Sequence, residues 1–164
     1  MRNKGYTLIE MIVVVAILGI LLGIVAVPGR DWMDRSRVEG QTKQMYADLM
    51  NARVNALKNK RFYFVTLGVK QYSVYEDTPN GNGTLDLVAD QVVMQKSTRY
   101  ALVSTPTITM LNFSADGLAT FTTATTVDIW CQSTGSPASD CIEISLTRIL
   151  MGKWNGTTST CIVQ

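Results

Sequence analysis

The hydrophobic positions of the chain fall into three stretches with different spacing, and the first is nearly continuous. From Met11 to Val27 there are 17 consecutive uncharged and mostly apolar residues, and the run extends back to Tyr6 with one charge at Glu10. A helix over residues 6–27 would be roughly 33 Å long at about 1.5 Å per residue. That length matches the apolar thickness of a bilayer. The first stretch therefore predicts a helix that spans a membrane.

In the second stretch, from residue 30 to residue 61, apolar residues recur at helical spacing. The positions of this stripe are Val38, Met45, Leu49, Ala52 and Ala56. An apolar stripe of this period predicts an amphipathic helix that packs on a sheet. Pro28 and Gly29 lie between the two helical stretches and predict a kink or a loosening of the helix there.

In the third stretch, residues 62–164, the period changes to two and the residues become aromatic and β-branched. This pattern predicts strands at 62–67, 71–75, 92–97, 101–103, 107–113, 118–122, 127–131, 141–146 and 149–154. The segment Ala115-Asp-Gly117 predicts a tight turn. The expected fold class is α+β, with a long N-terminal hydrophobic helix packed on a mainly antiparallel sheet. The expected division is residues 6–29 as the apolar helix and 30–164 as one globular domain, with its helix at 30–61 and its β domain at 62–164.

The composition excludes several classes of function. The chain of 164 residues has no histidine, which excludes catalytic triads with histidine and sites in which histidine holds a metal. The formal net charge is +2, so no strong overall field attracts nucleic acid. Because no nucleophile–base pair or metal cluster is evident either, we expect no enzymatic activity and no cofactor.

Charges at the N-terminus predict the orientation. Arg2 and Lys4 precede the apolar run, which places the N-terminus in the cytoplasm and the rest of the chain outside the inner membrane. A cleaved signal peptide and a simple single-pass anchor are alternatives. Neither accounts for Glu10, because a carboxylate at the start of a membrane helix is costly and usually has a function.

The segment Lys4-Gly-Tyr-Thr-Leu-Ile-Glu-Met11 resembles the processing site of type IV pilins and type II secretion pseudopilins. The resemblance implies that residues 1–5 are a leader peptide, that prepilin peptidase cuts after Gly5, and that the same enzyme methylates the new N-terminus at Tyr6. The family usually has phenylalanine at that position. It also implies assembly with other pilins into a filament, drawn from the inner membrane by a motor that acts through a platform protein. In such a filament Glu10 would pair with the cationic N-terminus of a neighbouring subunit and set the register.

The rest of the chain resembles one subgroup of that family. The segments Asp48–Ala56, Asn112–Gly117 and Ile144–Lys153 are similar to the helix, the central turn and the closing strands of GspH/FimT-type pseudopilins and minor pilins. The resemblance implies a low-abundance subunit that primes or caps a type IV pilus or a type II secretion pseudopilus. The sequence does not separate these two systems.

Two groups of residues are candidates for ligand binding. One is an acidic turn whose oxygen-bearing side chains suggest calcium: Asp77, Asn80, Asn82 and Asp86. An ordinary hairpin loop is the favoured interpretation, because the spacing lacks the full EF-hand pattern. The other group is Lys153 with Arg148 and Trp154, which lies where DNA-binding FimT-like pilins carry an arginine-rich segment. DNA uptake is therefore an alternative function, and a membrane-anchored ligand-binding domain is another.

Three cysteines leave the disulfide pairing open. Outside the inner membrane a disulfide can form, and three cysteines allow three single pairings. Cys131 and Cys141 flank a turn between two predicted strands, and we favour a bridge between them. Cys161, near the C-terminus, is the alternative partner for either.

Overall fold

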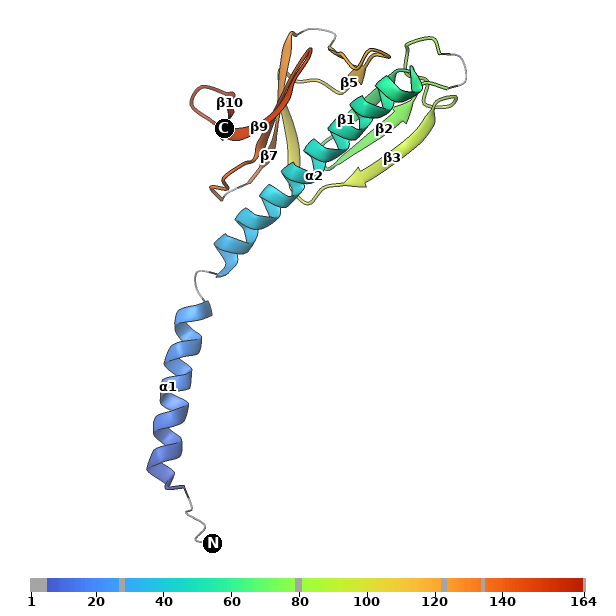
Figure 1. The fold of residues 1–164 in the computed structure, drawn as a ribbon. Coiled ribbons are helices and arrows are strands. Elements are labelled where there is room, and N and C mark those ends of the chain that lie inside the picture. The colour runs from blue at the N-terminus through green and yellow to red at the C-terminus, as the bar shows by residue number, and fades with distance from the viewer. Residues whose placement is uncertain (1–5, 27–28, 79–80, 122–123, 134, 164) are drawn as a thin grey trace. The chain divides into compact units, whose positions relative to one another are not determined.

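A computed structural model describes residues 6–26, 29–78, 81–121, 124–133 and 135–163 (Figure 1). Its contacts divide the chain into two units, Met1–Asp34 and Arg35–Gln164. Helix α1 spans Leu8–Ala26, and helix α2 spans Gly29–Asn59. The kink predicted at Pro28 falls on the residue pair 27–28, which lies outside the described residues.

The end of α2 has a defined cap. Lys60 adopts a left-handed conformation with a φ of 54°, and the Arg61 N–H donates to the Ala56 carbonyl at 3.4 Å. This arrangement is a Schellman motif, which normally uses glycine at the position of Lys60. The motif ends the helix at Asn59, and β1 begins at Tyr63.

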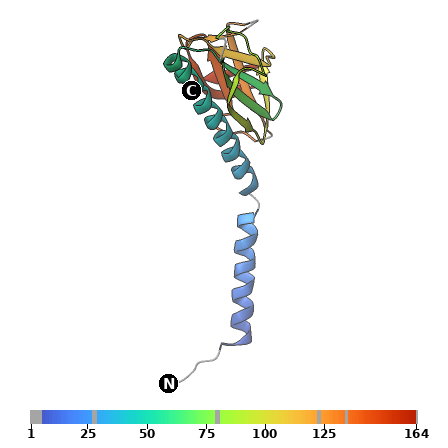
Figure 2. The same cartoon turned by 90° about the vertical axis from the view of Figure 1, so that its right-hand side faces the viewer.

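Within the described residues, ten strands form two antiparallel five-stranded sheets beside α2 (Figures 1 and 2). The first sheet has the order β3-β2-β1-β5-β6 and the second the order β10-β9-β8-β7-β4. The strands of the first sheet are β1 Tyr63–Gly68, β2 Gln71–Glu76, β3 Gln91–Ser97, β5 Met110–Phe113 and β6 Ala119–Thr120. Those of the second are β4 Ala101–Thr105, β7 Thr126–Gln132, β8 Cys141–Ser145, β9 Ile149–Asn155 and β10 Thr160–Val163. The α+β fold expected from the sequence is confirmed.

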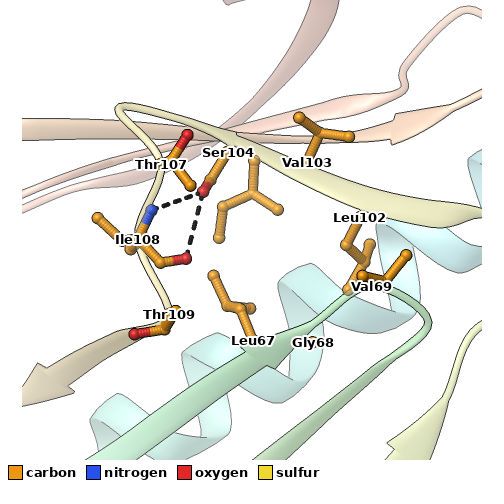
Figure 3. Close-up of a pocket in the computed structure, with 10 residues that line it drawn as sticks. Leu67, Gly68, Val69, Leu102, Val103, Ser104, Thr107, Ile108 and Thr109 are labelled. Carbon is orange, nitrogen blue, oxygen red and sulfur yellow. Dashed lines mark hydrogen bonds between the residues drawn. The ribbon is translucent and has the colours of Figure 1, made fainter.

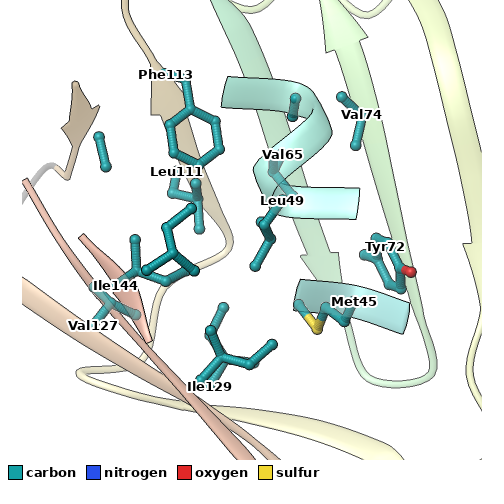
Figure 4. Close-up of a cluster of buried hydrophobic side chains, with 14 of the residues drawn as sticks. Met45, Leu49, Val65, Tyr72, Val74, Leu111, Phe113, Val127, Ile129 and Ile144 are labelled. Atoms are coloured by element: carbon teal, nitrogen blue, oxygen red, sulfur yellow. The ribbon is translucent and has the colours of Figure 1, made fainter. Parts of the chain in front are cut away.

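One core joins α2 to both sheets (Figure 4). Met45 and Leu49 on α2 are 1% exposed, and they lie among apolar side chains of both sheets, including Val65 of β1 and Ile129 of β7. All five positions of the predicted helical stripe are buried. The change of period from 3.6 to two at the end of α2 therefore marks the change from the helix to the sheets that cover it.

All nine predicted strands are present, but β5 and β6 are shorter than predicted. Before β5, the Ser104 hydroxyl accepts the Ile108 N–H at 3.0 Å. The residues between Thr105 and Met110 therefore form the loop between β4 and β5 and do not extend β5. The predicted turn at Gly117 is confirmed, since its φ is 70° and a Cβ there would lie 2.7 Å from Leu57 Cγ. The hydrophobic pattern does not predict β10, a four-residue strand that follows a run of threonine and serine.

Candidate functional site

Thr7 is the N-cap of the N-terminal helix, and Glu10 follows it in a Thr-x-x-Glu pattern. The Glu10 N–H lies 3.1 Å from the Thr7 carbonyl oxygen and 3.4 Å from the Thr7 hydroxyl. Thr7 thus precedes the first helical residue, and Glu10 lies in the first turn, where a negative charge is stabilised by the helix dipole. The sequence that resembles a processing site is therefore also a helix start. Gly5, the predicted cleavage position, lies outside the described residues.

Tyr6 and Glu10 are both open to solvent in the single chain. Tyr6 is 82% exposed, as access by a modifying enzyme requires, and Glu10 is exposed on the first turn of α1. An exposed carboxylate within an otherwise uncharged helix is available to a partner from another molecule. The roles of Gly5, Tyr6 and Glu10 in processing and assembly stay predictions.

The described apolar side chains of α1 have no core of their own. Residues 8–23 are all exposed, and the exposed fractions of the large apolar side chains run from 48% at Val14 to 77% at Leu8. Apolar surface of this extent normally marks contact with a membrane or another protein. Within the part of the chain that the structure describes, no helix combines the length and hydropathy needed to cross a membrane.

The disulfide joins Cys141 to Cys161, so the favoured pairing of Cys131 with Cys141 is wrong. Side chains alternate along a strand. Trp130, not Cys131, lies opposite Cys141, and Cys131 points to the other face of β7, where Gln41 donates to its sulfur at 3.1 Å. Burial raises the pKa of the Cys131 thiol, which therefore stays protonated and unreactive.

The disulfide fastens the C-terminal hairpin over the second sheet. The two Cα atoms lie 5.9 Å apart although β9 is between β8 and β10 in the sheet order. The Cys161 N–H also donates to Asp128 Oδ2 on β7 at 2.9 Å. Such an approach requires glycine at position 152, because any Cβ there would collide with the Ile162 carbonyl.

The acidic turn uses its oxygen atoms to hold its own backbone. Asp77 Oδ2 accepts the Gly83 N–H at 2.8 Å, Asn82 Oδ1 accepts the Thr84 N–H at 2.9 Å, and Asp86 Oδ1 accepts a backbone N–H in the same way. Asn80 lies outside the described residues. Among the described residues no three His, Cys, Asp or Glu side chains are grouped as metal ligands.

The three residues considered for DNA binding do not form one surface. Lys153 donates to the Ser136 hydroxyl at 2.9 Å and lies near Asp140. Trp154, on the opposite face of β9, stacks on Trp130 with ring centroids 3.6 Å apart. Arg148 directly precedes the first residue of β9, and the length of the strand places it about 16 Å from Lys153. A single isolated lysine gives little affinity for phosphate.

One polar cluster was not predicted from the sequence. Asp48 on α2 is 5% exposed, and its Oδ2 accepts the Tyr72 hydroxyl at 2.6 Å and the Lys96 ammonium at 2.7 Å. Burial and the hydrogen bond to Asp48 raise the pKa of Tyr72. The cluster unites α2, β2 and β3, so only the tertiary arrangement reveals it.

An apolar hollow of about 240 Å³ lies between the ends of β1 and β4 (Figure 3). Its apolar lining includes Leu67, Val69 and Leu102, and the hydroxyl of Ser104 is engaged with the backbone of Ile108. None of the residues that line it carries a charge. The hollow therefore offers no acid–base pair for catalysis.

Comparison with known proteins supports the sequence interpretation. Residues 1–26 match the prokaryotic N-terminal methylation motif. No curated protein sequence matches the chain. Two crystal structures of the type IV minor pilin FimU from Pseudomonas aeruginosa are similar, each 16% identical in sequence. The first, in space group P21, aligns with a TM-score of 0.54 over 73% of this chain and 91% of FimU. The second, in space group P65, aligns with a TM-score of 0.52 over 69% and 90%.

At this identity the similarity to FimU establishes the fold, and the motif supplies independent evidence from the N-terminus. The motif implies processing by prepilin peptidase and incorporation with other pilins. The indication of a structural subunit comes from this motif alone. The chain thus carries the prokaryotic N-terminal methylation motif ahead of a domain whose fold is similar to that of the type IV minor pilin FimU.

Proposed function

We propose that the protein is a minor pilin or pseudopilin of the GspH/FimT type that primes or caps a filament. Prepilin peptidase removes residues 1–5 and methylates Tyr6. The remaining chain stays anchored in the inner membrane by the apolar run of residues 6–27, with the β domain in the periplasm, until a motor and its platform protein draw it into a type IV pilus or a type II secretion pseudopilus.

One observation carries this proposal: the methylation motif is continuous with a helix whose described side chains are all exposed. About 25 cal/mol is gained for each Å² of apolar surface removed from water. A helix with large apolar side chains on every face thus has a strong tendency to pack in lipid or among other helices. A filament core made of such helices would remove this apolar surface from water.

In this proposal Glu10 determines the register of assembly. After cleavage the new N-terminus at Tyr6 carries a positive charge, methylated or not. Inside a bundle of apolar helices a carboxylate is costly unless it is paired, so the Glu10 carboxylate favours the one position where it meets the N-terminus of a neighbour. The exposed location of Glu10 in the single chain is consistent with this role.

The proposal is tested with the full chain in its native membrane. The N-terminal peptide and the co-purifying proteins are identified by mass spectrometry after gentle detergent extraction. We expect a methylated Tyr6 terminus and other pilins. A major pilin would indicate a pilus, and secretion pseudopilins would indicate the secretion system. An uncut Met1 terminus without filament partners would refute the proposal.

Glu10→Gln separates processing from assembly. We expect the variant to be cleaved after Gly5 but to be at least tenfold depleted from sheared filaments. Glu39→Gln is the matched control, because Glu39 lies on α2 and its side chain accepts the Ala138 N–H at 2.8 Å, which a glutamine oxygen can also do. If the two variants enter filaments equally, Glu10 has no role in register.

A further inference from the structure

Two exposed aromatic side chains lie at the two ends of the apolar N-terminal run. Tyr6 begins the run and is 82% exposed, and Trp32 follows it near the start of α2 and is 72% exposed. Met33, the next residue, is 43% exposed. Tryptophan is highly buried on average in folded proteins. An indole as open as that of Trp32 therefore points to a contact outside the chain.

The charged residues indicate where the apolar layer ends. The chain has no charge between Glu10 and Arg30. Five of the eight residues 30–37 are then charged: Arg30, Asp31, Asp34, Arg35 and Arg37. Because a charge is costly in hydrocarbon, the boundary between hydrocarbon and headgroups falls near residue 30 when the run of residues 6–27 is in a bilayer. Trp32 lies just past that boundary.

The spacing of the two aromatic residues fits a bilayer with its headgroups. Tyr6 and Trp32 are 26 residues apart, which is roughly 39 Å of helix at about 1.5 Å per residue. A bilayer is about 40–45 Å thick when its headgroup regions are included. Tyrosine and tryptophan are enriched at both membrane–water interfaces, where the ring meets apolar groups and its polar atom meets water. The chain thus provides one such ring for each interface.

We infer that Trp32 lies among the lipid headgroups of the periplasmic leaflet and fixes the depth at which the chain leaves the inner membrane. The partner is a phospholipid surface, whose phosphate and ester oxygens can accept the indole N–H. Met33 adds apolar surface beside the ring. This inference rests on the proposed function, since it takes residues 6–27 to be the membrane anchor, and it adds a positioning residue that lies outside that run.

The depth of Trp32 is measured by tryptophan fluorescence on the full chain in phosphatidylcholine vesicles. A nitroxide quencher is attached either to the lipid headgroup or to the end of the acyl chain. The contribution of Trp32 is the difference between the wild type and Trp32→Phe. We expect the headgroup nitroxide to quench this contribution roughly twofold more than the nitroxide at the end of the acyl chain.

Trp32→Phe is a matched control because it keeps an aromatic ring at this position. The chain has three tryptophans, and the other two, Trp130 and Trp154, stack on each other in the β domain. Their fluorescence in Trp32→Phe should respond much less to either nitroxide. A chain with Trp130→Phe and Trp154→Phe keeps Trp32 alone and measures its depth directly. If that double variant does not fold, the difference measurement still gives the answer.

Three results would overturn the inference. Stronger quenching by the nitroxide at the end of the acyl chain would place Trp32 in the hydrocarbon. Quenching by acrylamide in the aqueous phase, without quenching by either lipid, would place it in water. Protection from all three quenchers would mean that another protein chain covers it.

Failure of this inference and failure of the proposed function are distinguishable. Flotation of the chain with the vesicles measures anchorage without reference to Trp32. A chain that floats, but whose Trp32 the headgroup nitroxide does not quench, would refute the inference alone. A chain that does not float would refute the anchorage and the inference together. A chain with the expected quenching that keeps its Met1 terminus in the native membrane would refute the filament function alone.

Discussion

Helix α1 and the β domain use apolar residues in opposite ways. In α1 the large apolar side chains of residues 8–23 are at least 48% exposed. In the β domain, Phe113, Val65 and Ile144 are at most 1% exposed, between α2 and two sheets. One part of the molecule buries its apolar side chains within its own fold, while the described apolar side chains of the other part stay exposed.

The two regions also differ in the kinds of apolar residue that they contain. A buried side chain must match the shape of its surroundings, so the core contains residues of varied size from tyrosine to alanine. The α1 helix repeats isoleucine, leucine, valine and glycine, which provide apolar surface without specific shape. Its one specific feature is the charged residue Glu10.

A matched pair of leucine substitutions, one in α1 and one in the core, should show the largest difference between the exposed and the buried apolar residues. Leu49→Ala removes a side chain that is 1% exposed and should lower the free energy of unfolding of the β domain by about 2–5 kcal/mol. Leu18→Ala, at 52% exposure, should leave it unchanged within about 0.5 kcal/mol. Chemical denaturation of both variants, followed by tryptophan fluorescence, measures the difference. Equal losses would mean that α1 packs on the domain.

The disulfide is a further stabilising feature of the β domain that α1 lacks. Replacing Cys141 and Cys161 together by alanine should cost about 2–4 kcal/mol, measured by denaturation of the variant against the oxidised wild type.

The pairing is checked separately by alkylation in denaturant without a reductant. One modified cysteine, Cys131, is expected from the structure. Modification of Cys161 instead would restore the pairing that the sequence suggested.

The buried cluster around Asp48 should have a smaller effect. Tyr72→Phe removes one hydrogen bond to Asp48 and leaves the one from Lys96, so we expect a loss of about 1 kcal/mol. Tyr75→Phe on the same strand is the control, since Tyr75 is only half-buried and should change stability less. If both substitutions cost the same, the hydrogen bond to Asp48 contributes nothing specific.

The smallest predicted effect concerns the carboxylate of Asp128, with the carboxylate of Glu10 as its control. Burial raises the pKa of Asp128, its Oδ1 has no partner among the described residues, and Glu143 lies directly opposite on β8. A raised folded-state pKa means that the folded state binds the proton more tightly. The stabilisation is complete below the unfolded-state pKa and is lost as pH rises through the folded-state pKa.

Asp128→Asn should therefore raise the melting temperature at pH 7 by on the order of a few degrees, and by less at pH 4. The asparagine oxygen can still accept the Cys161 N–H. Glu10→Gln should leave the melting temperature of the domain unchanged at both pH values. A lower melting temperature of Asp128→Asn at pH 7 would show that the charged form is stabilising.

The sequence predicted the features that depend on local order. The motif from Gly5 to Glu10, the stripe that buries Met45 and Leu49, and the alternation in the strands are all visible within a few turns or strands of chain. The match of residues 1–26 to the methylation motif and the fold agree with these predictions.

Features that depend on which face a residue occupies were not predictable. Cys131 and Cys141 are close in sequence, but their strands place them on opposite faces of the sheet. Cys161 reaches Cys141 only because β10, a strand that the pattern did not reveal, folds back over β8. The cluster of Asp48, Tyr72 and Lys96 joins three elements, and no local pattern indicates that they meet.

The place of the disulfide in the chain has a consequence for biogenesis. A polypeptide delivered across a membrane N-terminus first presents Cys131 and Cys141 to oxidants before Cys161 arrives. A premature bond between the first two would trap a non-native domain. The contacts of Cys131 with Gln41 and Thr42 oppose that bond, because α2 precedes β7 in the chain and covers the Cys131 thiol once β7 has docked. In the proposed export, the native bond can close only after the last strand, which carries Cys161, has been delivered.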